Sequence, residues 1–242
     1  GVAAIGSATA LGLAFVILLP MPQTAIDQSV TILKTLDFRP VWQNRSALAY
    51  IVAYSCHMWE MFAARSWLVA FMTYSISLQT VTDGHVAPTT VMAIAGIGGM
   101  LSSIGGGELA TRFGRRRTVS TIMLISCILA VIIGFSAALP YAVVVLLCFF
   151  YTLFFQGDSA AIHAGVITAA EPQRRGATMA LQSLAGFAAA SVGSVVAGIV
   201  LDLTGGGGST LSWGITFVSL AFPAALGPFI LQRLDNQPAH PG

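Results

Sequence analysis

Two stretches of the sequence place ionisable side chains inside apolar segments. They read YSCHMWEMFAARSW (residues 54–67) and YTLFFQGDSAAIHAG (residues 151–165). A carboxyl group in an apolar environment keeps its proton, whereas a water-filled cavity favours the ionised form. An acid whose surroundings change between these two environments takes up and releases a proton. Polar side chains beside it can bind a solute. The candidate residues for this chemistry are Glu60, His57, Asp158, His163, Gln156 and Arg65.

Helical spacing arranges the side chains of the first stretch. Glu60 lies about 22 Å from the start of its apolar run, at 1.5 Å per residue, which is near the middle of a bilayer. His57 shares a face with Glu60, because residues three apart are neighbours on a helix. Arg65 points away from both, and either extends to lipid head groups or faces a cavity where it attracts an anion. For Glu60 a structural role stays open, in which it only bonds to His57 or to a neighbouring helix.

The second stretch places polar side chains on two faces of one helix. Gln156, Ser159 and His163 form a stripe at spacings of three and four residues. Asp158 is rotated by about 100° from Ser159. We expect one of these faces to line a cavity and the other to contact a neighbouring helix. Gly157, beside the acid, is expected to loosen the helix locally.

The composition identifies the environment of these stretches. Hydrophobic residues make up 56% of the 242 residues and charged residues 8%, whereas a soluble domain carries about 25% charge. The chain is therefore expected to be an all-α integral membrane protein. The formal net charge of +2 is too small for a nucleic-acid partner. Cys56, Cys127 and Cys148 lie in apolar runs without ligand or pairing spacing, so we expect no disulfide, metal site or cofactor.

Long apolar runs mark the helices that must hold the sites, because roughly 20 apolar residues cross about 30 Å of hydrocarbon. Proline, glycine and charge clusters separate these runs. We expect a polytopic bundle of seven transmembrane helices at residues 2–20, 46–77, 88–110, 118–139, 141–168, 176–203 and 211–232. Two of the runs carry small residues at a four-residue spacing, which favours close helix packing. These are Gly99, Ser103 and Gly107 in one run, and Gly186, Ala190, Ser194 and Gly198 in another.

The first residues and the connection after them show weaker patterns. The chain begins with Gly1 rather than Met and lacks the pattern of a signal peptide, so we expect it to be truncated upstream. In residues 21–45, apolar side chains with helical spacing occur at Ile26, Val30, Leu33 and Leu36. This segment is either an amphipathic helix on the membrane surface or an irregular loop.

Basic residues gather in alternate connections, which indicates the orientation because Lys and Arg near helix ends favour the cytoplasm. The connections near residues 83–85, at Pro140 and at residues 202–209 contain no Lys or Arg. The amino terminus is then expected outside the cell, and the carboxyl terminus in the cytoplasm. Of the 11 basic residues, all but Arg65 lie on the cytoplasmic side: Lys34, Arg39, Arg45, Arg112, Arg115, Arg116, Arg117, Arg174, Arg175 and Arg233.

One of these connections, GGGELATRFGRRR (residues 105–117), carries a motif. It is similar to the loop signature that follows the second helix of each six-helix half in the major facilitator superfamily of secondary transporters. The residues that match in register are Gly107, Arg112, Gly114, Arg115 and Arg116. Thr111 stands where the signature has Asp, so a charge relay through that position is not expected. Glycine still permits a tight turn, and the arginines can bond helix-end carbonyls in one conformation and release them in another.

The resemblance covers the whole chain and implies its domain organisation. EPQRRGATMALQ (residues 171–182) resembles the cytosolic turn between the tenth and eleventh of the family's twelve helices. Residues 1–20 would be the last helix of the first half, and residues 21–45 the cytoplasmic linker. Residues 46–235 would be the six-helix second half, followed by a tail at residues 236–242. The expected partners are a small solute, protons, the lipid bilayer and the first six-helix half.

The resemblance also implies a function, which is secondary active transport of a small solute by alternating access in a bacterial inner membrane. Proton coupling is favoured, because no sodium site can be read from the sequence. The solute class stays open, since Arg65 favours an organic anion whereas aromatic side chains would suit an aromatic or cationic molecule. The aromatic residues concerned are Trp59, Trp67, Tyr151, Phe154 and Phe155.

Other functions fit the residues less well. A retinal protein needs a lysine in its last helix, and Lys34, the single lysine, lies in the linker. GFSA at Gly134 and FQGD at Phe155 are incomplete versions of intramembrane protease signatures, so an enzyme is not expected. A sensor or scaffold that uses the same fold without transporting stays an alternative.

Overall fold

A computed structural model describes residues 38–81 and 84–234. The predicted first span (residues 2–20), the apolar pattern at residues 26–36 and the tail (residues 236–242) lie outside the described residues. The predicted spans within them are helical, and no strand occurs in this part of the chain. The α-helices are α3 Arg39–Gln43, α4 Arg45–Ser77, α5 Pro88–Phe113, α6 Arg115–Gly134, α7 Tyr141–Gly157, α8 Ser159–Ala169, α9 Arg175–Leu203 and α10 Thr210–Leu234; a 3-10 turn, η1 Pro172–Arg174, precedes α9.

Five of the described helical spans are long and apolar enough to cross a membrane, by length and composition. They are Pro88–Phe113, Arg115–Gly134, Tyr141–Ala169, Pro172–Leu203 and Thr210–Leu234. α4 is longer still, at 33 residues, but its ionisable and hydroxyl side chains lower its mean hydropathy. Polar side chains at membrane depth face the interior of a bundle or a water-filled cavity. We therefore expect α4 to be enclosed by other helices on most sides.

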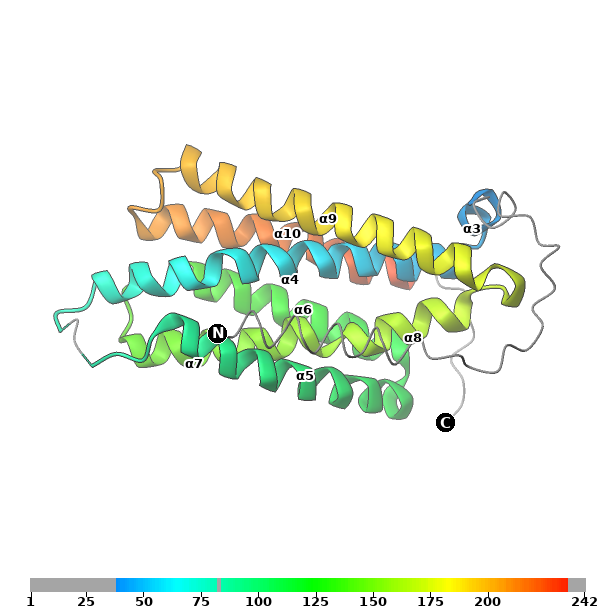
Figure 1. The fold of residues 1–242 in the computed structure, drawn as a ribbon, viewed down its shortest axis with the longest axis horizontal. Coiled ribbons are helices and arrows are strands. Elements are labelled where there is room, and N and C mark those ends of the chain that lie inside the picture. Colours follow the sequence, from blue (N-terminus) through cyan, green and yellow to red (C-terminus); the bar gives the residue numbers. More distant parts are fainter. Residues whose placement is uncertain (1–37, 82–83, 235–242) are drawn as a thin grey trace, which may run out of the picture. The chain divides into compact units, whose positions relative to one another are not determined.

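The packing agrees with that expectation. α4 contacts α7, α8, α9 and α10, and Figure 1 shows it between α9 and α10 on one side and the α5, α7 and α8 group on the other. α5 packs mainly on α7, and α6 packs mainly on α10. The helix that carries His57, Glu60 and Arg65 is therefore the central helix of the described part.

Aromatic side chains of α4 pack on glycines of α9, in agreement with the predicted small-residue stripe. Because each glycine lacks a Cβ, an aromatic ring of α4 can lie closer to the α9 backbone than a larger residue would allow. The pairs are Tyr54 with Gly186, Trp59 with Gly193 and Trp67 with Gly198. Trp67 also donates a hydrogen bond from Nε1 to the carbonyl oxygen of Ser194, at 3.1 Å. Gly193 was not part of the predicted stripe.

The connection between α5 and α6 is shorter than predicted. Spans at residues 88–110 and 118–139 would leave a loop of several residues, whereas the structure has the single residue Gly114 between the two helices. Its φ of 87° lies in the left-handed region, which glycine adopts without the steric cost that a side chain would bring. The three arginines at residues 115–117 therefore form the first turn of α6, which ends at Gly134 rather than at residue 139.

Candidate functional site

The predicted span at residues 141–168 is interrupted at its centre. α7 ends at Gly157, α8 begins at Ser159, and Asp158 between them has φ −85° and ψ −12°. An interruption leaves backbone groups without their intrahelical partners. The predicted loosening at Gly157 agrees with this one-residue break, at which Asp158 keeps right-handed helical angles and its carbonyl oxygen still accepts a hydrogen bond from the backbone N–H of Ile162 at 2.9 Å.

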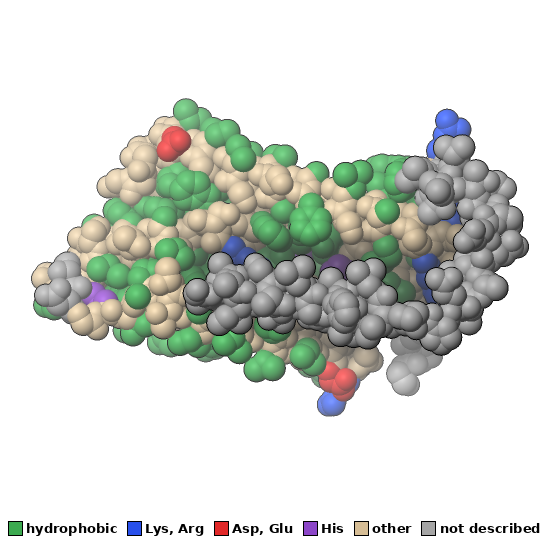
Figure 2. Space-filling view, in the orientation of Figure 1, with side chains coloured by type: hydrophobic (Ala, Val, Ile, Leu, Met, Phe, Trp, Pro, Cys, Tyr) green, Lys and Arg blue, Asp and Glu red, His purple; other side chains and the backbone are tan. Residues whose placement is uncertain are grey.

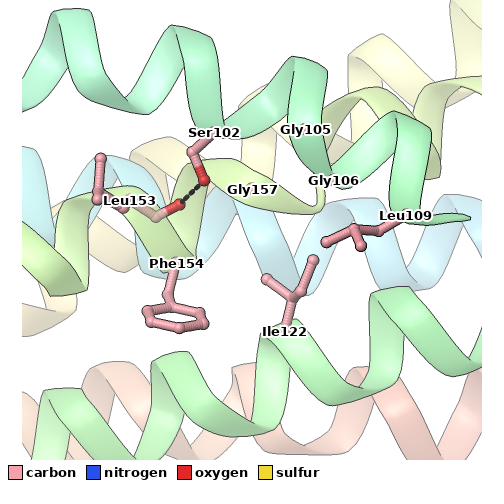
Figure 3. Close-up of a pocket in the computed structure, with 8 residues that line it drawn as sticks. All are labelled: Ser102, Gly105, Gly106, Leu109, Ile122, Leu153, Phe154 and Gly157. Atoms are coloured by element: carbon pink, nitrogen blue, oxygen red, sulfur yellow. Dashed lines mark hydrogen bonds between the residues drawn. The ribbon is translucent and has the colours of Figure 1, made fainter.

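Two serines of α5 bond the backbone groups at this break. Ser102 donates from its hydroxyl to the carbonyl oxygen of Leu153 at 2.7 Å, as Figure 3 shows. Ser103 accepts a hydrogen bond from the backbone N–H of Ala160 at 3.2 Å. α5 thus adds one side-chain donor and one side-chain acceptor to the backbone on the two sides of the break. This stabilises the break in the absence of water.

The glycines of α5 allow this close contact. A Cβ at Gly106 would lie 1.8 Å from the carbonyl oxygen of Gly157, which is far inside van der Waals contact. A Cβ at the neighbouring Gly105 would meet nothing within 4 Å. Figure 3 shows Gly106 and Gly157 side by side at the rim of a pocket of about 200 Å³ between α5, α6 and α7. The backbone of α5 therefore rests directly on the break.

The acid at the break faces a histidine of α4. Asp158 Oδ1 lies 2.8 Å from His57 Nδ1, and both side chains are 2% exposed. The two atoms are at ion-pair distance but not in hydrogen-bond alignment, and within the described residues Asp158 Oδ1 and His57 Nε2 have no hydrogen-bond partner. The ring of Tyr54 stacks near His57, with centroids 6.1 Å apart. The structure thus brings together two residues that the sequence placed on separate predicted helices.

Glu60 bonds to a neighbouring helix rather than to His57. Its Oε1 accepts a hydrogen bond of 2.7 Å from the hydroxyl of Ser126 on α6, and the side chain is 2% exposed. The hydroxyl of Tyr151 on α7 is also buried and interacts electrostatically with this carboxylate. Ser126 was not among the predicted site residues, because a lone serine in an apolar helix gives no signal of its partner.

Arg65 bonds to Gln156 on the other side of α4. The guanidinium Nη2 donates to Gln156 Oε1 at 2.5 Å, and the arginine side chain is exposed while the glutamine is half-buried. Gln156 is one residue from the middle of the span Tyr141–Ala169. Arg65 is four residues, or about 6 Å, from the middle of α4. The arginine therefore lies within the long helix α4, away from its ends, and is held toward α7.

His163 pairs with a residue that the sequence analysis missed. Its Nδ1 lies 3.0 Å from Nε2 of Gln182 on α9, and Gln182 is buried. Gln182 Oε1 has no hydrogen-bond partner in the described part of the chain. Gln182 belongs both to the stretch that resembles a cytosolic turn (residues 171–182) and to the predicted span at residues 176–203, and it lies two turns inside α9. Its depth within an apolar helix was the signal that could have identified it.

The residues of the loop motif are placed at one end of the bundle. Gly107 packs on α8, where a Cβ would lie 3.4 Å from the Cβ of Ala160. Arg112 forms an exposed ion pair with Glu108 at 2.8 Å, one helical turn away. Thr111, at the position of the signature's Asp, donates its hydroxyl hydrogen bond to the backbone of its own helix. None of these contacts involves a site residue at mid-membrane depth.

The arginine clusters lie at the same end. Arg115 donates from Nη1 to the hydroxyl of Thr168, at 3.1 Å, close to the end of α8. Arg174 and Arg175 follow that end within a few residues. Asn44 at the start of α4 donates to the carbonyl of Ala169, at 2.8 Å. Arg116 and Arg117 line a surface pocket at this end together with Gln232 of α10. Residues 112–117 and 174–175 are therefore on one side of the bundle, as the alternating arginine pattern predicted.

The described residues contain no group of three or more His, Cys, Asp or Glu side chains that could hold a metal ion. Apolar helices with buried ionisable side chains at mid-depth define an integral, multi-pass membrane protein. Residues 51–242 match the family model described as Major Facilitator Superfamily, and the chain belongs to this family. The resemblance seen in the loop motif is thereby confirmed.

Relatives of known annotation agree with this assignment. The chain is 32% identical over 145 residues to proteins called multidrug efflux pump Tap from Mycobacterium tuberculosis (strain ATCC 25618 / H37Rv) and Mycobacterium bovis (strain BCG / Pasteur 1173P2). The match covers 60% of this chain and 32% of each relative, so it spans about a third of their length. The comparisons place the chain among transporters rather than enzymes.

Proposed function

We propose that the full-length protein moves a small solute across the membrane by alternating access and couples this movement to protons. Residues 46–235 would form the second of its two six-helix halves. The observation that carries the proposal is the buried pair of His57 and Asp158, which joins α4 to the break between α7 and α8. Family membership and the name of the relatives support transport as the class of activity.

The geometry of the pair suggests how protons are coupled. While the pair is buried, the ionised carboxylate of Asp158 is stabilised mainly by attraction to protonated His57, since buried charges need a partner. When the cavity opens to water, the carboxylate no longer needs a charged partner, so His57 can release its proton to the solution, and the attraction between α4 and the α7–α8 break is lost. A break held by side-chain hydrogen bonds can change its angle more easily than a continuous helix. Proton release and movement of α8 would then favour one another.

The other polar contacts have supporting roles in this proposal. Glu60, bonded to Ser126, is the second candidate to carry the proton. His163 with Gln182 and Arg65 with Gln156 lie on the α8 and α7 sides of the same cluster and belong to the solute cavity. The arginine-rich end is placed in the cytoplasm, because cationic side chains near helix ends favour that side. A bacterial inner membrane is the proposed location.

The test is solute accumulation in proteoliposomes that contain the full-length protein. We expect an imposed pH gradient to drive accumulation of at least one solute from a screen of small organic molecules. With one proton per neutral solute, one pH unit supports about tenfold accumulation, since 1.4 kcal/mol corresponds to a factor of ten. A screen in which no solute accumulates would contradict transport and would favour the sensor or scaffold alternative.

The hydrogen bond between Arg115 and Thr168 is proposed to stabilise one conformation of the cycle. Replacing Arg115 and Arg116 by alanine should slow turnover severalfold, because an exposed hydrogen bond to a neutral hydroxyl contributes about 0.5–1.5 kcal/mol. The measurement is the initial rate of solute exchange at saturating solute. Arg117→Ala serves as the matched control in the same helical turn. An unchanged rate in the double variant would leave these arginines only an orientation signal.

A further inference from the structure

The exposed face of α4 differs from the exposed faces of the other long helices. No large apolar side chain of α4 is exposed, whereas α6 exposes Leu124, Ile128, Val131 and Ile132 to its surroundings. The exposed residues of α4 beyond its first turn are Arg65, Ser66, Ala70, Thr73 and Ser77. Ser66, Ala70, Thr73 and Ser77 recur at spacings of four, three and four and so form one stripe, and Arg65 borders this stripe, about 100° around the helix from Ser66. We call this stripe the α4 polar stripe.

The α4 polar stripe does not suit contact with lipid. A guanidinium within a membrane-spanning helix is costly in hydrocarbon, and such groups face a bundle interior or a water-filled cavity. Ser66 and Thr73 satisfy their hydroxyl hydrogens within the helix, by bonds to carbonyls four residues earlier. Ser66 also bonds to Ser194 of α9. The stripe therefore forms a polar wall beside α7 and α9.

Arg65 carries a positive charge beside this wall, without an acidic partner among residues 38–81 and 84–234. The ion pairs within the described residues join His57 to Asp158, Arg112 to Glu108 and Arg174 to Glu171. Gln156 is neutral and accepts one hydrogen bond from the guanidinium, which has five N–H donors. Figure 2 shows acidic side chains toward the ends of the bundle on its visible described surface, whereas basic and histidine side chains also occur in its middle part. The guanidinium therefore keeps N–H donors that an anion can accept from.

Most of the aromatic residues that would favour a cationic solute are buried or pack against neighbouring helices. Tyr151 and Phe155 are buried, and the rings of Trp59 and Trp67 lie on glycines of α9. Phe187 of α9 remains 55% exposed. It meets Phe62, one turn before Ser66, in an edge-to-face contact with centroids 6.1 Å apart. An apolar surface therefore borders the α4 polar stripe one turn away from the arginine.

We propose that Arg65, oriented by Gln156, binds the acidic group of an amphipathic organic anion whose apolar part packs on Phe62 and Phe187. A carboxylate or sulfonate fits the planar fork of a guanidinium with two parallel hydrogen bonds. This inference rests on the proposed transport function and names the solute class for the same cavity.

The first test uses two dyes that share a ring system and differ in charge, 6-carboxyfluorescein and rhodamine 123, in proteoliposomes with the full-length protein. We expect transport of the anionic dye, and a roughly ten- to hundredfold loss of its apparent affinity in Arg65→Gln. Arg65→Lys keeps the charge but not the fork and should lose less. Arg233→Gln makes the same charge change at the end of α10 and should behave as the wild type.

A second measurement tests the wall itself without a solute. In a variant whose native cysteines are serines, Ser66→Cys and Thr73→Cys should react with a membrane-impermeant methanethiosulfonate. Ile128→Cys, exposed on the apolar face of α6, should not react, because a thiol in hydrocarbon stays protonated. Labelling of Ile128→Cys with no labelling of Ser66→Cys and Thr73→Cys would overturn the assignment of the stripe to a cavity.

The outcomes separate this inference from the proposed function. Transport confined to cationic or neutral solutes would overturn the anion site and leave transport intact. An equal loss for both dyes in Arg65→Gln would also overturn it, since the arginine would then hold a conformation rather than a solute. Absence of any transported solute, including those in the pH-gradient screen, would contradict the proposed function itself.

Discussion

Asp158→Asn is expected to abolish accumulation driven by a pH gradient while leaving exchange of solute across the membrane measurable. Asparagine has nearly the same shape but does not ionise, so the variant keeps the break between α7 and α8 and loses the proton. His57 then lacks the charge that lies 2.8 Å from its ring in the wild type. We expect accumulation to fall to the level reached without a gradient, about tenfold below the wild type for one pH unit.

The measurement compares uphill accumulation with counterflow in the same proteoliposomes. Counterflow needs the conformational cycle but no net proton movement, so it reports whether the variant still moves. Asp202→Asn removes an exposed acid near the end of α9 and serves as the matched control. Normal accumulation in Asp158→Asn would remove this residue from the coupling mechanism.

Glu60→Gln in the same assay decides between the two buried acids. Its carboxylate accepts a hydrogen bond from Ser126, which a glutamine oxygen can also accept. If only Asp158→Asn loses accumulation, the pair at the break carries the proton and Glu60 holds α4 against α6. If only Glu60→Gln loses accumulation, the roles are reversed.

The helical spans were predictable because their physical cause is local. A run of about 20 apolar residues must form a helix in lipid, where the backbone has no other partner for its polar groups. The alternation of basic clusters fixed the relative direction of the helices, and Arg115 and Arg174 indeed lie at one end. The length of the turn at Gly114 was not predictable, since a single residue with positive φ replaces what apolar periodicity would treat as a loop.

The members of the candidate site were predictable, but their pairing was not. An ionisable residue at membrane depth stands out in any apolar sequence, as Glu60 and Asp158 do. The partner of each depends on which helices pack together, so nothing in the spacing indicated that His57 faces Asp158 or that Ser126 bonds to Glu60. Gln182 was missed because it follows a basic turn closely in sequence, although it is buried inside α9.

The break between α7 and α8 depends on a contact that can be tested with two neighbouring residues. Gly106 lies so close to the carbonyl oxygen of Gly157 that a Cβ would be 1.8 Å from it. The oxygen belongs to the backbone and the position of a Cβ is set by the backbone, so neither can move aside by a change of rotamer. Gly106→Ala must therefore separate α5 from the break, with loss of the hydrogen bonds from Ser102 and Ser103.

We expect Gly106→Ala to lower the melting temperature of the full-length protein in detergent by roughly 5 °C or more, because overpacking a close contact costs about 1–3 kcal/mol. Transport should fall more than tenfold, since the break positions Asp158 opposite His57. Gly105→Ala adds the same methyl group one residue earlier, where nothing lies within 4 Å, and should match the wild type. Equal behaviour of the two variants would show that α5 does not rest on the break, and the coupling of α5 to the buried pair would have to be abandoned.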